Sequence, residues 1–575
     1  MNVLGINIWS HDTSACLIAD GRLVCAVEEE RFIGEKHTTK FPMNAIKAVL
    51  GERSLTIDAV NAICIGWDYQ RMVRYQYLKP AMESDNELRA LPNYFNRLSN
   101  FLNTEQVVRE QTGFKGAVNF VEHHLAHATL AAYSAGISDA LSVVVDGYGD
   151  RETLTIFTVK DGVHTRVFGC EFPASVGLVY TAVTDYLGFR RNCDEGIVMG
   201  LASYGNPHAQ VPGTVLTYIE TFRNLVRDHK DTIFEIDPRY FPFGNFRQGF
   251  FTKTFESLFG SRRTPGAPIG DEHKNVAAAL QLRTEEILEQ ILVFGERYSD
   301  SNSVLLSGGV ALNCVANAKL VNGSGKNKRR SILVPPNPGD AGVAIGAALH
   351  YCAKKGINVQ ARSLTHLGPE YLLSQLESAA KGSLGQVTSP EDLHGALVER
   401  LAAGKICALF DGGSEFGPRA LGHRSILTAP YPASMKDFLN KRVKFREEFR
   451  PFAPMVREEE ASKYFEIDYP TPYMMHAVPI RPEMQSLIPA VVHVDGTGRV
   501  QTVNKNDSPF VHKLLGRFGE KCGVPIILNT SFNVKGQPIV ETPEQAVDTF
   551  NKTEIDCLVM PPFCIDKQRS DSSKA

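Results

Sequence analysis

Apolar and polar positions repeat one strand arrangement near the start of the chain. Residues 3–30 place an apolar strand, a polar loop, a second apolar run, an Asp20-Gly21 turn and a third strand in succession. Residues 141–168 follow the same order, with their turn at Asp161-Gly162. An Asp-Gly pair between apolar runs is typical of a β-hairpin. The repeat predicts a duplicated lobe in which each unit directs its first polar loop toward a shared site.

Two later patterns continue this first domain. Residues 304–306 predict a buried strand, followed by a Ser-Gly-Gly turn and a helix. Small residues let a backbone approach a ligand closely, and a helix N-terminus favours anions, so this layout suits nucleotide contact. A plain structural turn is the alternative. Residues 275–298 have the apolar spacing of a long amphipathic helix that packs the domain together.

Past residue 355 the patterns weaken, which predicts a connecting segment over 356–390 and a second domain over 391–568. Residues 406–430 suggest a strand, a Gly-rich turn and another strand. A helix start follows later, where Thr542 can cap, Pro543 takes the first helical position and Gln545 completes a capping box. The polar tail, 569–575, is expected to be disordered.

Composition limits the classes of function. The 575 residues exceed the usual size of one domain, so 1–355 and 391–568 are expected to fold as separate cores. Lys and Arg total 61 against 64 Asp and Glu, which leaves no basic field for nucleic acid. No signal peptide and no apolar run of about 20 residues is found, so a cytoplasmic protein without a membrane span is expected. The 11 cysteines form no C-x-x-C pair, which argues against zinc ribbons and a disulfide framework.

Three histidines lie within five positions of the stretch VEHHLAHA. In a helix, His123 and His127 share one face one turn apart and can bind one cation, whereas His124 points elsewhere. Asp146, at a strand end, and Asp340, before a small-residue helix, are candidate further ligands. Two imidazoles and two carboxylates suit Fe(II), Mn(II) or Zn(II), and the spacing does not choose among them. Capping and core packing are the alternative for all four.

The second domain concentrates cationic side chains in and near turns. Arginine forks and lysine point charges at several turns are what polyphosphate binding requires. A solvated face paired to Glu447 and Glu448 is the alternative, and it is the preferred interpretation of Arg446. An amide and a hydroxyl after the apolar run 524–528 can orient a phosphate or a small polar group. The candidates are Arg419, Arg424, Lys444, Arg450, Arg499, Asn529 and Ser531.

Motifs along nearly the whole chain resemble a known enzyme family. They are HDTSACLIADG, VEEERF, EHHLAHA, VVVDGYGD, LSGGVALN, PGDAGVAIGAAL, FGPRALGHRSIL, REEFRPFAP, HVDGTGRVQTV and LNTSFNVKGQPIVETPEQA, in this order. The chain thereby resembles the O-carbamoyltransferases of the nodulation and cephamycin type (NodU/CmcH), and most closely the antibiotic-tailoring members of the tobramycin carbamoyltransferase type. The resemblance implies an α/β protein with a duplicated ASKHA fold in its N-terminal part and a YrdC-like C-terminal part.

The resemblance also implies a two-step reaction. The C-terminal domain would join carbamoyl phosphate to Mg-ATP, giving carbamoyl-adenylate and pyrophosphate, and would use the seven candidates named above. The N-terminal domain would then transfer the carbamoyl group to a hydroxyl of a small-molecule natural product, such as a sugar, an aminoglycoside or a macrolide, with release of AMP. Its metal, with Fe(II) the expected ion, would be held by His123, His127, Asp146 and Asp340. Nucleotide contacts would come from Ser307, Gly308, Gly309 and Asn313.

His11 and Asp12 match the family's first histidine motif, and His11 is the candidate for positioning or deprotonating the acceptor. One departure is visible. The chain reads DEGIVMG where many members have Glu-x-Lys-x-Met-Gly, so Ile197 replaces the lysine while Glu195 remains. No acceptor role is therefore assigned to this segment, and the sequence does not identify the acceptor.

Two other functions were weighed against this expectation. An ASKHA-fold ATP-binding switch or sugar kinase would leave the phosphate-type residues of the second domain without a purpose. Carbamoyl transfer to tRNA would call for a basic surface, and transfer to a hydrogenase-maturation thiol would call for added Cys pairs, neither of which the sequence has.

Overall fold

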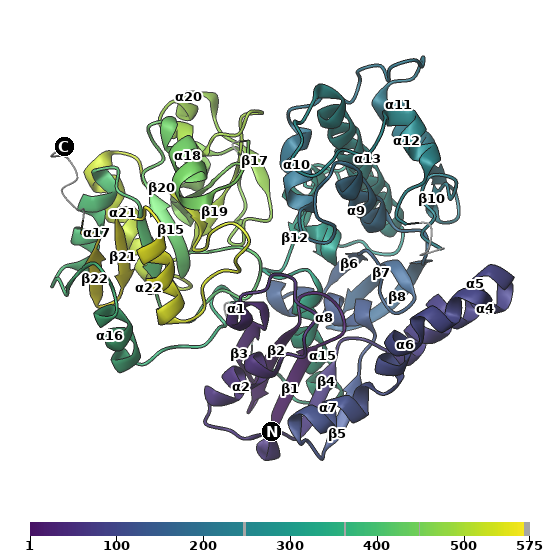
Figure 1. The fold of residues 1–575 in the computed structure, drawn as a ribbon, viewed down its shortest axis with the longest axis horizontal. Coiled ribbons are helices and arrows are strands. Elements are labelled where there is room, and N and C mark those ends of the chain that lie inside the picture. The colour runs from purple at the N-terminus through teal and green to yellow at the C-terminus, as the bar shows by residue number, and fades with distance from the viewer. Residues whose placement is uncertain (245–248, 361–363, 448, 569–575) are drawn as a thin grey trace. The chain divides into compact units, whose positions relative to one another are not determined.

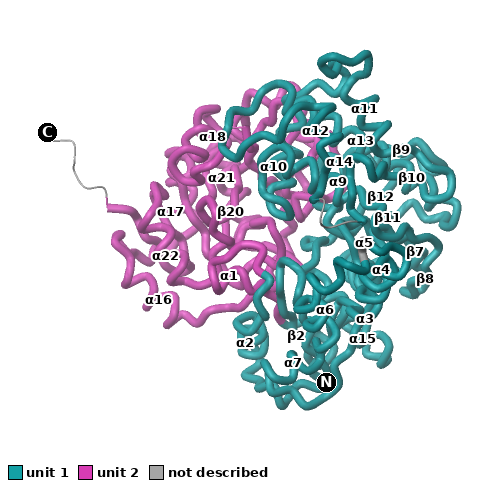
Figure 2. The backbone as a smooth tube through the Cα atoms, turned by 45° about the vertical axis from the view of Figure 1, so that its right-hand side comes forward, with its two compact units in different colours: residues 1–24, 39–362 teal, residues 25–38, 363–575 magenta. Residues whose placement is uncertain are grey.

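The computed structural model describes residues 1–244, 249–360, 364–447 and 449–568. Its backbone forms two compact units, coloured separately in Figure 2. Unit 1 comprises residues 1–24 and 39–362, and unit 2 comprises residues 25–38 and 363–575. The tail expected at 569–575 lies outside the described residues.

Unit 1 is built on two five-stranded sheets that share one strand order (Figure 1). In each, the first strand along the chain pairs antiparallel with the second and parallel with the fourth. The duplicated ASKHA-type lobe is therefore confirmed. The first sheet, in spatial order, is β3 (Arg22–Glu28), β2 (Ser14–Ala19), β1 (Asn2–Asn7), β4 (Ala62–Ile65) and β5 (Ala117–Phe120). The second is β8 (Val163–Glu171), β7 (Glu152–Lys160), β6 (Ala140–Val145), β11 (Ser303–Ser307) and β12 (Ser331–Leu333).

The two predicted hairpin turns are present. Asp20 and Gly21 have φ of 51° and 70°, and Asp161 and Gly162 have φ of 51° and 76°. Positive φ at both central residues is the geometry of the two-residue turn whose twist matches that of the flanking strands. The Asp-Gly pairs thus fix the register of both hairpins.

Two helices connect the sheets of unit 1. Helix α8 (His123–Ala135) packs on β6 and β11, and α15 (Val343–Lys354) packs on β1, β2 and β4. The helices also pack against each other, with the ideal Cβ of Gly346 placed 1.9 Å from the Ala126 carbonyl oxygen. Because no side chain fits at Gly346, the small residues of both helices are required for this close approach. The N-terminal ends of α8 and α15 are thereby held near each other.

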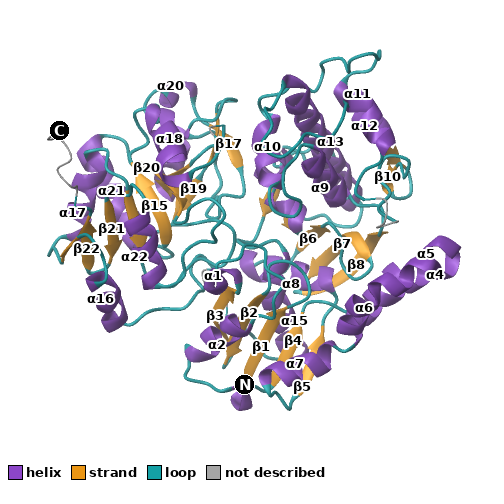
Figure 3. Cartoon of the chain, viewed as in Figure 1, coloured by secondary structure: helices purple, strands orange, loops and turns teal. Residues whose placement is uncertain are grey.

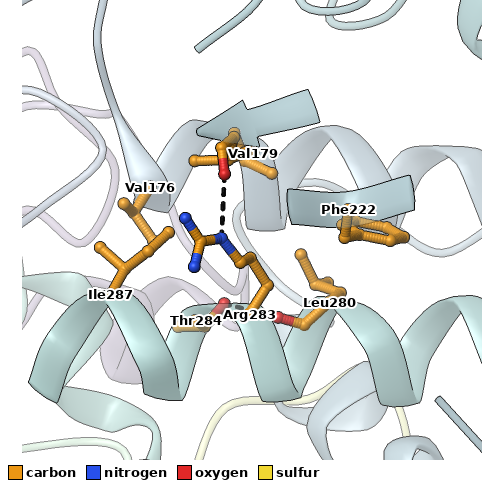
Figure 4. Close-up of a pocket in the computed structure, with 8 residues that line it drawn as sticks. Val176, Val179, Phe222, Leu280, Arg283, Thr284 and Ile287 are labelled. Carbon is orange, nitrogen blue, oxygen red and sulfur yellow. Dashed lines mark hydrogen bonds between the residues drawn. The ribbon is translucent and has the colours of Figure 1, made fainter. Parts of the chain in front are cut away.

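The predicted long helix is α13 (Asp271–Gly295), which packs against α10 (Glu195–Ala202) and α11 (Tyr218–Leu225). A cavity of about 10 Å³ lies beside it (Figure 4), and there Arg283 Nε donates to the Val226 carbonyl at 2.9 Å. Its volume matches one water at most. The cavity is a packing defect and holds no substrate.

A helical insert follows β4 and extends from the first sheet of unit 1 (Figure 3). Its helices include α3 (Tyr69–Met72), η2 (Val73–Leu78), α4 (Lys79–Glu83), α5 (Asp85–Ala90), η3 (Leu91–Tyr94), α6 (Phe95–Leu102) and α7 (Thr104–Thr112). Tyr69, Tyr77 and Phe101 are buried on the inner side of the insert. Among the described residues, no helix is long and apolar enough to cross a membrane.

Unit 2 contains an eight-stranded mixed sheet, which agrees with the α/β class expected for the second part of the chain. In spatial order its strands are β13 (Gln386–Thr388), β22 (Phe563–Asp566), β21 (Cys557–Met560), β14 (Cys407–Phe410), β15 (Arg424–Thr428), β20 (Ile526–Ser531), β16 (Ala453–Arg457) and β19 (Gln501–Val503). Helices α17 (Leu393–Ala402) and α21 (Pro509–Cys522) pack against each other, and their apolar faces join the core beneath this sheet. The predicted capping box of Thr542 and Gln545 is present at the start of α22 (Pro543–Lys552).

The segment expected to be a connection, 356–390, carries regular structure in its second half. Helix α16 (Leu373–Lys381) packs on α22, and β13 pairs with β22. The apolar pattern is weak here, because β13 is an exposed edge strand and lacks the apolar alternation of a half-buried one.

Residues 25–38 belong to unit 2 although they follow β2 in the chain. Arg31 fixes them there. Its Nε lies 2.9 Å from Glu28 Oε2, its Nη1 lies 3.8 Å from Glu541 Oε2, and its Nη2 donates to the Gly417 carbonyl at 2.9 Å. Arg31 and Glu541 are both almost fully buried, so each charge depends on the other for its stability.

Replacing Arg31 with methionine is expected to destabilise unit 2 by about 3–5 kcal/mol, because it leaves Glu541 and Glu28 buried without their cation. Hydrogen exchange of the β14 and β20 amides is the suitable measurement, since it reports on this unit by itself. The control is Arg53→Met, at an exposed position of unit 1. Unchanged protection in the Arg31 variant would contradict a stabilising role for this ion pair.

Candidate functional site

The four candidate metal ligands of unit 1 lie close together at the N-terminal ends of α8 and α15. We call these four residues the metal-type group. His123 and His127 lie on one face of α8, Asp146 follows β6, and Asp340 begins the short η6 (Asp340–Gly342) before α15. One ligand atom of each residue lies within 4.8 Å of the other three. His127 Nε2 lies 3.2 Å from Asp146 Oδ2 and 3.1 Å from His123 Nε2, and His123 Nε2 lies 3.7 Å from Asp340 Oδ1. The structure thus brings together the four residues predicted from the sequence.

Their surroundings fit a divalent ion. His123 Nδ1 lies 2.9 Å from the Gly66 carbonyl oxygen, so this nitrogen donates and leaves the Nε2 lone pair facing the group. Trp67 stacks on the His123 ring at 3.6 Å and fixes its plane. Asp146 Oδ2 is buried and accepts no hydrogen bond within the described chain. A carboxylate oxygen buried in this way is costly unless a cation or a donor satisfies it.

Two carboxylates and a third histidine set the charge of this group. Burial raises the pKa of Asp146, but the close imidazoles of His123 and His127 outweigh it, and the pKa falls well below its usual value. Burial, opposed by His11 and reinforced by Asp146, raises the pKa of Asp340 to about 6. His11 Nδ1 lies 2.6 Å from Asp12 Oδ2, and His11 Nε2 lies 3.9 Å from Asp340 Oδ2. Both predicted catalytic residues therefore border the metal-type group.

His124 has a different role, as its helical position predicts. Its Nδ1 lies 2.7 Å from Thr155 Oγ1 on β7, and burial lowers its pKa well below 6.5. It points toward the second sheet and stays neutral, so it contributes to packing.

The loop after β11 passes close to Asp146. Gly308 has φ of 87°, and a Cβ on it would lie 2.3 Å from the Val145 carbonyl oxygen. A Cβ on Gly309 would lie 3.1 Å from Asp146 Oδ1. Ser307 Oγ is buried and has no hydrogen-bond partner within the described chain. The predicted nucleotide loop therefore adjoins the metal-type group, and only glycine fits at its closest point.

Asn313 ends this loop and caps α14 (Cys314–Leu320), accepting from the Ala316 amide at 3.0 Å. Its side chain also exchanges hydrogen bonds with Gln281 at 2.9 and 3.0 Å. Gln281 lies on α13, to which the sequence assigns only a packing role. Buried polar residues on an amphipathic helix, here Gln281 with Arg283, Thr284 and Glu285, are the signal that would have identified it.

Ile197 is buried on α10, so its apolar side chain belongs to the core of unit 1. Glu195 accepts from Thr181 Oγ1 at 3.1 Å and from the Asn192 amide at 2.7 Å. These contacts give Glu195 a structural role at the start of α10.

The second candidate site lies in unit 2, around Lys444. Lys444 Nζ is buried and donates to the Ser531 carbonyl and Asn533 carbonyl, each at 2.8 Å, and to Asn533 Oδ1 at 2.5 Å. All of these acceptors are neutral. Burial lowers the pKa of Lys444 well below 10.5, and the nearby charges of Arg446, Lys36 and Arg450 lower it further. A buried lysine surrounded by other cations is stabilised when an anion binds.

Further cations share this environment. Burial lowers the pKa of Arg446, and Arg450 and Arg499 lower it further. Arg446 Nε donates to Asn440 Oδ1 at 2.8 Å and its guanidinium lies over the Phe452 ring, so the preferred interpretation of Arg446 as part of a solvated face is wrong. Arg450 lies 3.6 Å from Glu447, whose charge also acts on Arg446. We define the cation cluster as Lys36, Lys444, Arg446, Arg450 and Arg499.

Lys36 was not predicted from the sequence. It belongs to the 25–38 segment that Arg31 fixes within unit 2, and no local pattern indicates that a residue so early in the chain joins a site formed after residue 440. The VEEERF motif, which contains Arg31, is the one sequence feature that points to this segment.

Asn529 and Ser531 lie within β20, which ends three residues beyond the end expected for that strand, and both pair with β15. Asn529 Nδ2 donates to the Ala420 carbonyl at 2.8 Å, and its Oδ1 is buried without a partner in the described chain. Ser531 Oγ lies 3.2 Å from Lys444 Nζ. Arg419 is half-buried in the Gly-rich loop that precedes β15.

Arg424 differs from the other predicted phosphate ligands. It is fully buried on β15, donates to the Asp411, Gly412 and His423 carbonyls, and lies 3.6 Å above the Phe410 ring. Burial lowers its pKa, while the carboxylates of Glu541 and Glu415 oppose that shift. These contacts favour a structural role for Arg424 over the predicted contact with phosphate, because its fork is already engaged with backbone oxygens.

Anion binding at the cation cluster is expected to take up protons at alkaline pH. The pKa of Lys444 is depressed without ligand, a bound phosphate raises it, and between these two values binding adds a proton to Lys444. Affinity therefore falls as pH rises through this window. Calorimetric titration with pyrophosphate in buffers of different ionisation enthalpy measures the uptake. A heat independent of the buffer at every alkaline pH would contradict it.

Comparison with known proteins covers both units of the chain. Residues 2–349 match the family model described as carbamoyltransferase N-terminus, and residues 398–567 match the model described as carbamoyltransferase C-terminus. The nodulation protein NolNO of Sinorhizobium fredii is 34% identical, over 98% of this chain and 80% of that protein. Nodulation protein U of Rhizobium tropici is 29% identical, over 93% of this chain and 92% of its own.

Two solved structures resemble parts of the chain. Component A of the Acidaminococcus fermentans (R)-2-hydroxyglutaryl-CoA dehydratase is 14% identical and covers 62% of this chain and 98% of its own, with a TM-score of 0.34. HypF of T. kodakarensis is 14% identical and covers 63% of this chain and 49% of its own, with a TM-score of 0.30.

Proposed function

Since this chain belongs to the carbamoyltransferase family, we propose that it is an ATP-dependent O-carbamoyltransferase that works through carbamoyl-adenylate. Unit 2 would form the adenylate in two bond changes: water cleaves carbamoyl phosphate to carbamate and inorganic phosphate, and a carbamate oxygen then attacks the α-phosphorus of Mg-ATP, which releases pyrophosphate. Unit 1 would transfer the carbamoyl group to a hydroxyl of a small-molecule natural product and release AMP. The observation that carries this proposal is the cation cluster of unit 2, in which the buried Lys444 ammonium donates to neutral oxygens and lies near further cations.

The chemistry of the first step suits that cluster. Joining two phosphate compounds brings several negative oxygens together, and their mutual repulsion must be offset before reaction. Lys444 supplies a point charge, while Arg450 and Arg499 supply forks that match phosphate oxygens. Asn529 Oδ1, buried without a partner, is suited to accept from the carbamoyl amide group.

The second step suits the metal-type group. His123, His127, Asp146 and Asp340 would hold a divalent ion, for which we propose Fe(II). When bound, such an ion acts as a Lewis acid and a template that offsets negative charge. The chain's own residues complete the site: the loop of Ser307, Gly308, Gly309 and Asn313 offers backbone amides and a hydroxyl to the nucleotide. Because both steps would occur in one protein, the reactive adenylate would stay inside it, which limits hydrolysis of the adenylate.

His11 is positioned to accept a proton from the hydroxyl group of the carbamoyl acceptor. Its ring is 38% exposed, whereas the rings of His123 and His127 are fully buried. Asp12 fixes the ring through Nδ1, so Nε2 is the nitrogen presented to an incoming hydroxyl. We assign His11 the role of orienting that hydroxyl and accepting its proton.

The test uses purified full-length protein with ATP and carbamoyl phosphate and no acceptor. Pyrophosphate is expected to appear, and omission of carbamoyl phosphate is expected to abolish it. Metal-replete protein that releases no pyrophosphate would overturn the two-step assignment. Phosphate transfer from ATP to a sugar in the same protein would instead support the kinase alternative.

A further inference from the structure

A ladder of flat side chains runs from the metal-type group into the helical insert of unit 1. Measured between ring centroids, Trp67 stacks on His123 at 3.6 Å. Tyr69 lies parallel to Trp67 at 6.1 Å, and Phe101 stacks on Tyr69 at 4.9 Å. Arg97 then lies over the Phe101 ring at 5.3 Å. Trp67, Tyr69 and Phe101 are buried, so this aromatic ladder is a rigid connection between the insert and the transfer site.

Tyr148 lies beside the aromatic ladder. Its ring is tilted against that of Trp67, with the two ring centroids 6.3 Å apart, and Tyr148 is close enough to His11 for an electrostatic interaction. The Arg97 guanidinium and the Tyr148 hydroxyl also interact electrostatically. His11, Tyr148 and Arg97 are all partly or largely exposed, unlike the ladder beneath them. They form a row of accessible polar groups that begins at the candidate acceptor base.

Arg97 differs in its contacts from two other arginines of this region. Arg71 pairs with Glu122 and Glu152, and Arg151 pairs with Glu171. Arg97 forms no ion pair with any residue that the structure describes; its contacts are the Phe101 ring and Tyr148. An arginine held by an aromatic face retains most of its N–H groups for a ligand, and its planar fork matches a carboxylate.

We infer that Arg97 and Tyr148 bind the acceptor, and that this acceptor is a sugar-like hydroxyl compound carrying a carboxylate. The inference rests on the proposed function and names its substrate class. The Tyr148 ring would support the apolar face of the sugar, and its hydroxyl would bond a ring substituent. Arg97 would bind the carboxylate, leaving a neighbouring hydroxyl directed at His11. A cationic amino sugar would be repelled by Arg97.

The experiment measures transfer from radiolabelled carbamoyl phosphate to three matched probes: methyl glucuronide, methyl glucoside and methyl glucosaminide. The uronide is expected to have a kcat/KM at least about 10-fold above the neutral glycoside, since a bidentate charged contact is worth about 1.5–3 kcal/mol. The glucosaminide is expected to be the poorest probe. Arg97→Gln should remove the preference mainly by raising KM for the uronide, and Arg97→Lys should restore part of it.

Arg74→Gln is the matched control, because Arg74 is exposed on the same insert and lies over the neighbouring Tyr75 ring. No transfer to the uronide, an equal rate with all three probes, or an Arg97→Gln defect that is the same for charged and neutral probes would overturn the inference. Pyrophosphate release without acceptor is measured alongside. Its absence would contradict the proposed function, whereas its presence with any of the results above would contradict the acceptor class alone.

Discussion

Replacement of Lys444 with methionine is expected to lower acceptor-independent pyrophosphate release by about 10- to 100-fold. The lysine is the buried cation nearest to Ser531, and each charge-assisted contact that it makes to a phosphate oxygen is worth about 1.5–3 kcal/mol. Methionine has a similar length and no charge. Release of pyrophosphate from ATP and carbamoyl phosphate is followed with a coupled phosphate assay at saturating metal.

The matched control for this variant is Arg442→Met. Arg442 lies on the same helical turn, η7 (Asn440–Lys444), but it is exposed and pairs with Glu554. Its replacement should leave pyrophosphate release unchanged. If carbamoyl-adenylate is supplied directly, the Lys444 variant should still transfer the carbamoyl group. Equal loss in both reactions would show that Lys444 supports the fold or both steps, and would exclude a specific role in adenylate formation.

Replacement of His127 with alanine is expected to lower metal affinity at least about 100-fold and to abolish acceptor carbamoylation. Loss of a residue that merely supports a ligand already costs about 10- to 100-fold in affinity, and His127 Nε2 is itself within 3.2 Å of Asp146. Pyrophosphate release should persist. The metal content of the purified variant, measured by mass spectrometry, reports the first effect without any assay of activity.

His124→Gln serves as the matched control on the same helix. His124 bonds Thr155 and points away from the group, and glutamine can keep that hydrogen bond. Metal content equal to that of the unmodified chain is expected for this variant. Equal metal loss in both variants would contradict the assignment of the four ligands.

The sequence predicts the duplicated lobe well, because the determinants of each hairpin are local. Asp20-Gly21 and Asp161-Gly162 specify their turns, and alternating apolar runs specify the strands beside them. The placement of residues 25–38 in unit 2 could not be predicted in the same way. It depends on Arg31 meeting Glu541 more than 500 positions away, and such pairing leaves no periodic signal.

The candidate metal group was predictable for a similar reason. The i, i+4 spacing of His123 and His127 fixes their common face, and strand and helix ends place Asp146 and Asp340. The cation cluster was harder to predict, since burial decides which arginines face a ligand. Arg446 and Arg424 both occur in charged or Gly-rich turns, yet the structure assigns Arg446 to the cluster and surrounds Arg424 with backbone oxygens.

The discontinuity of unit 2 also has a consequence for synthesis on the ribosome. Arg31 and Lys36 emerge among the first residues, whereas Glu541 and Asn533 are among the last. Arg31 and Lys36 must therefore wait for these neighbours until nearly the whole polypeptide has been translated, while β1, β2 and β3 can already pair. A C-terminal fragment that begins at residue 363 would lack Arg31 and Lys36, and it should recover adenylate formation only when a peptide covering residues 25–38 is added in trans.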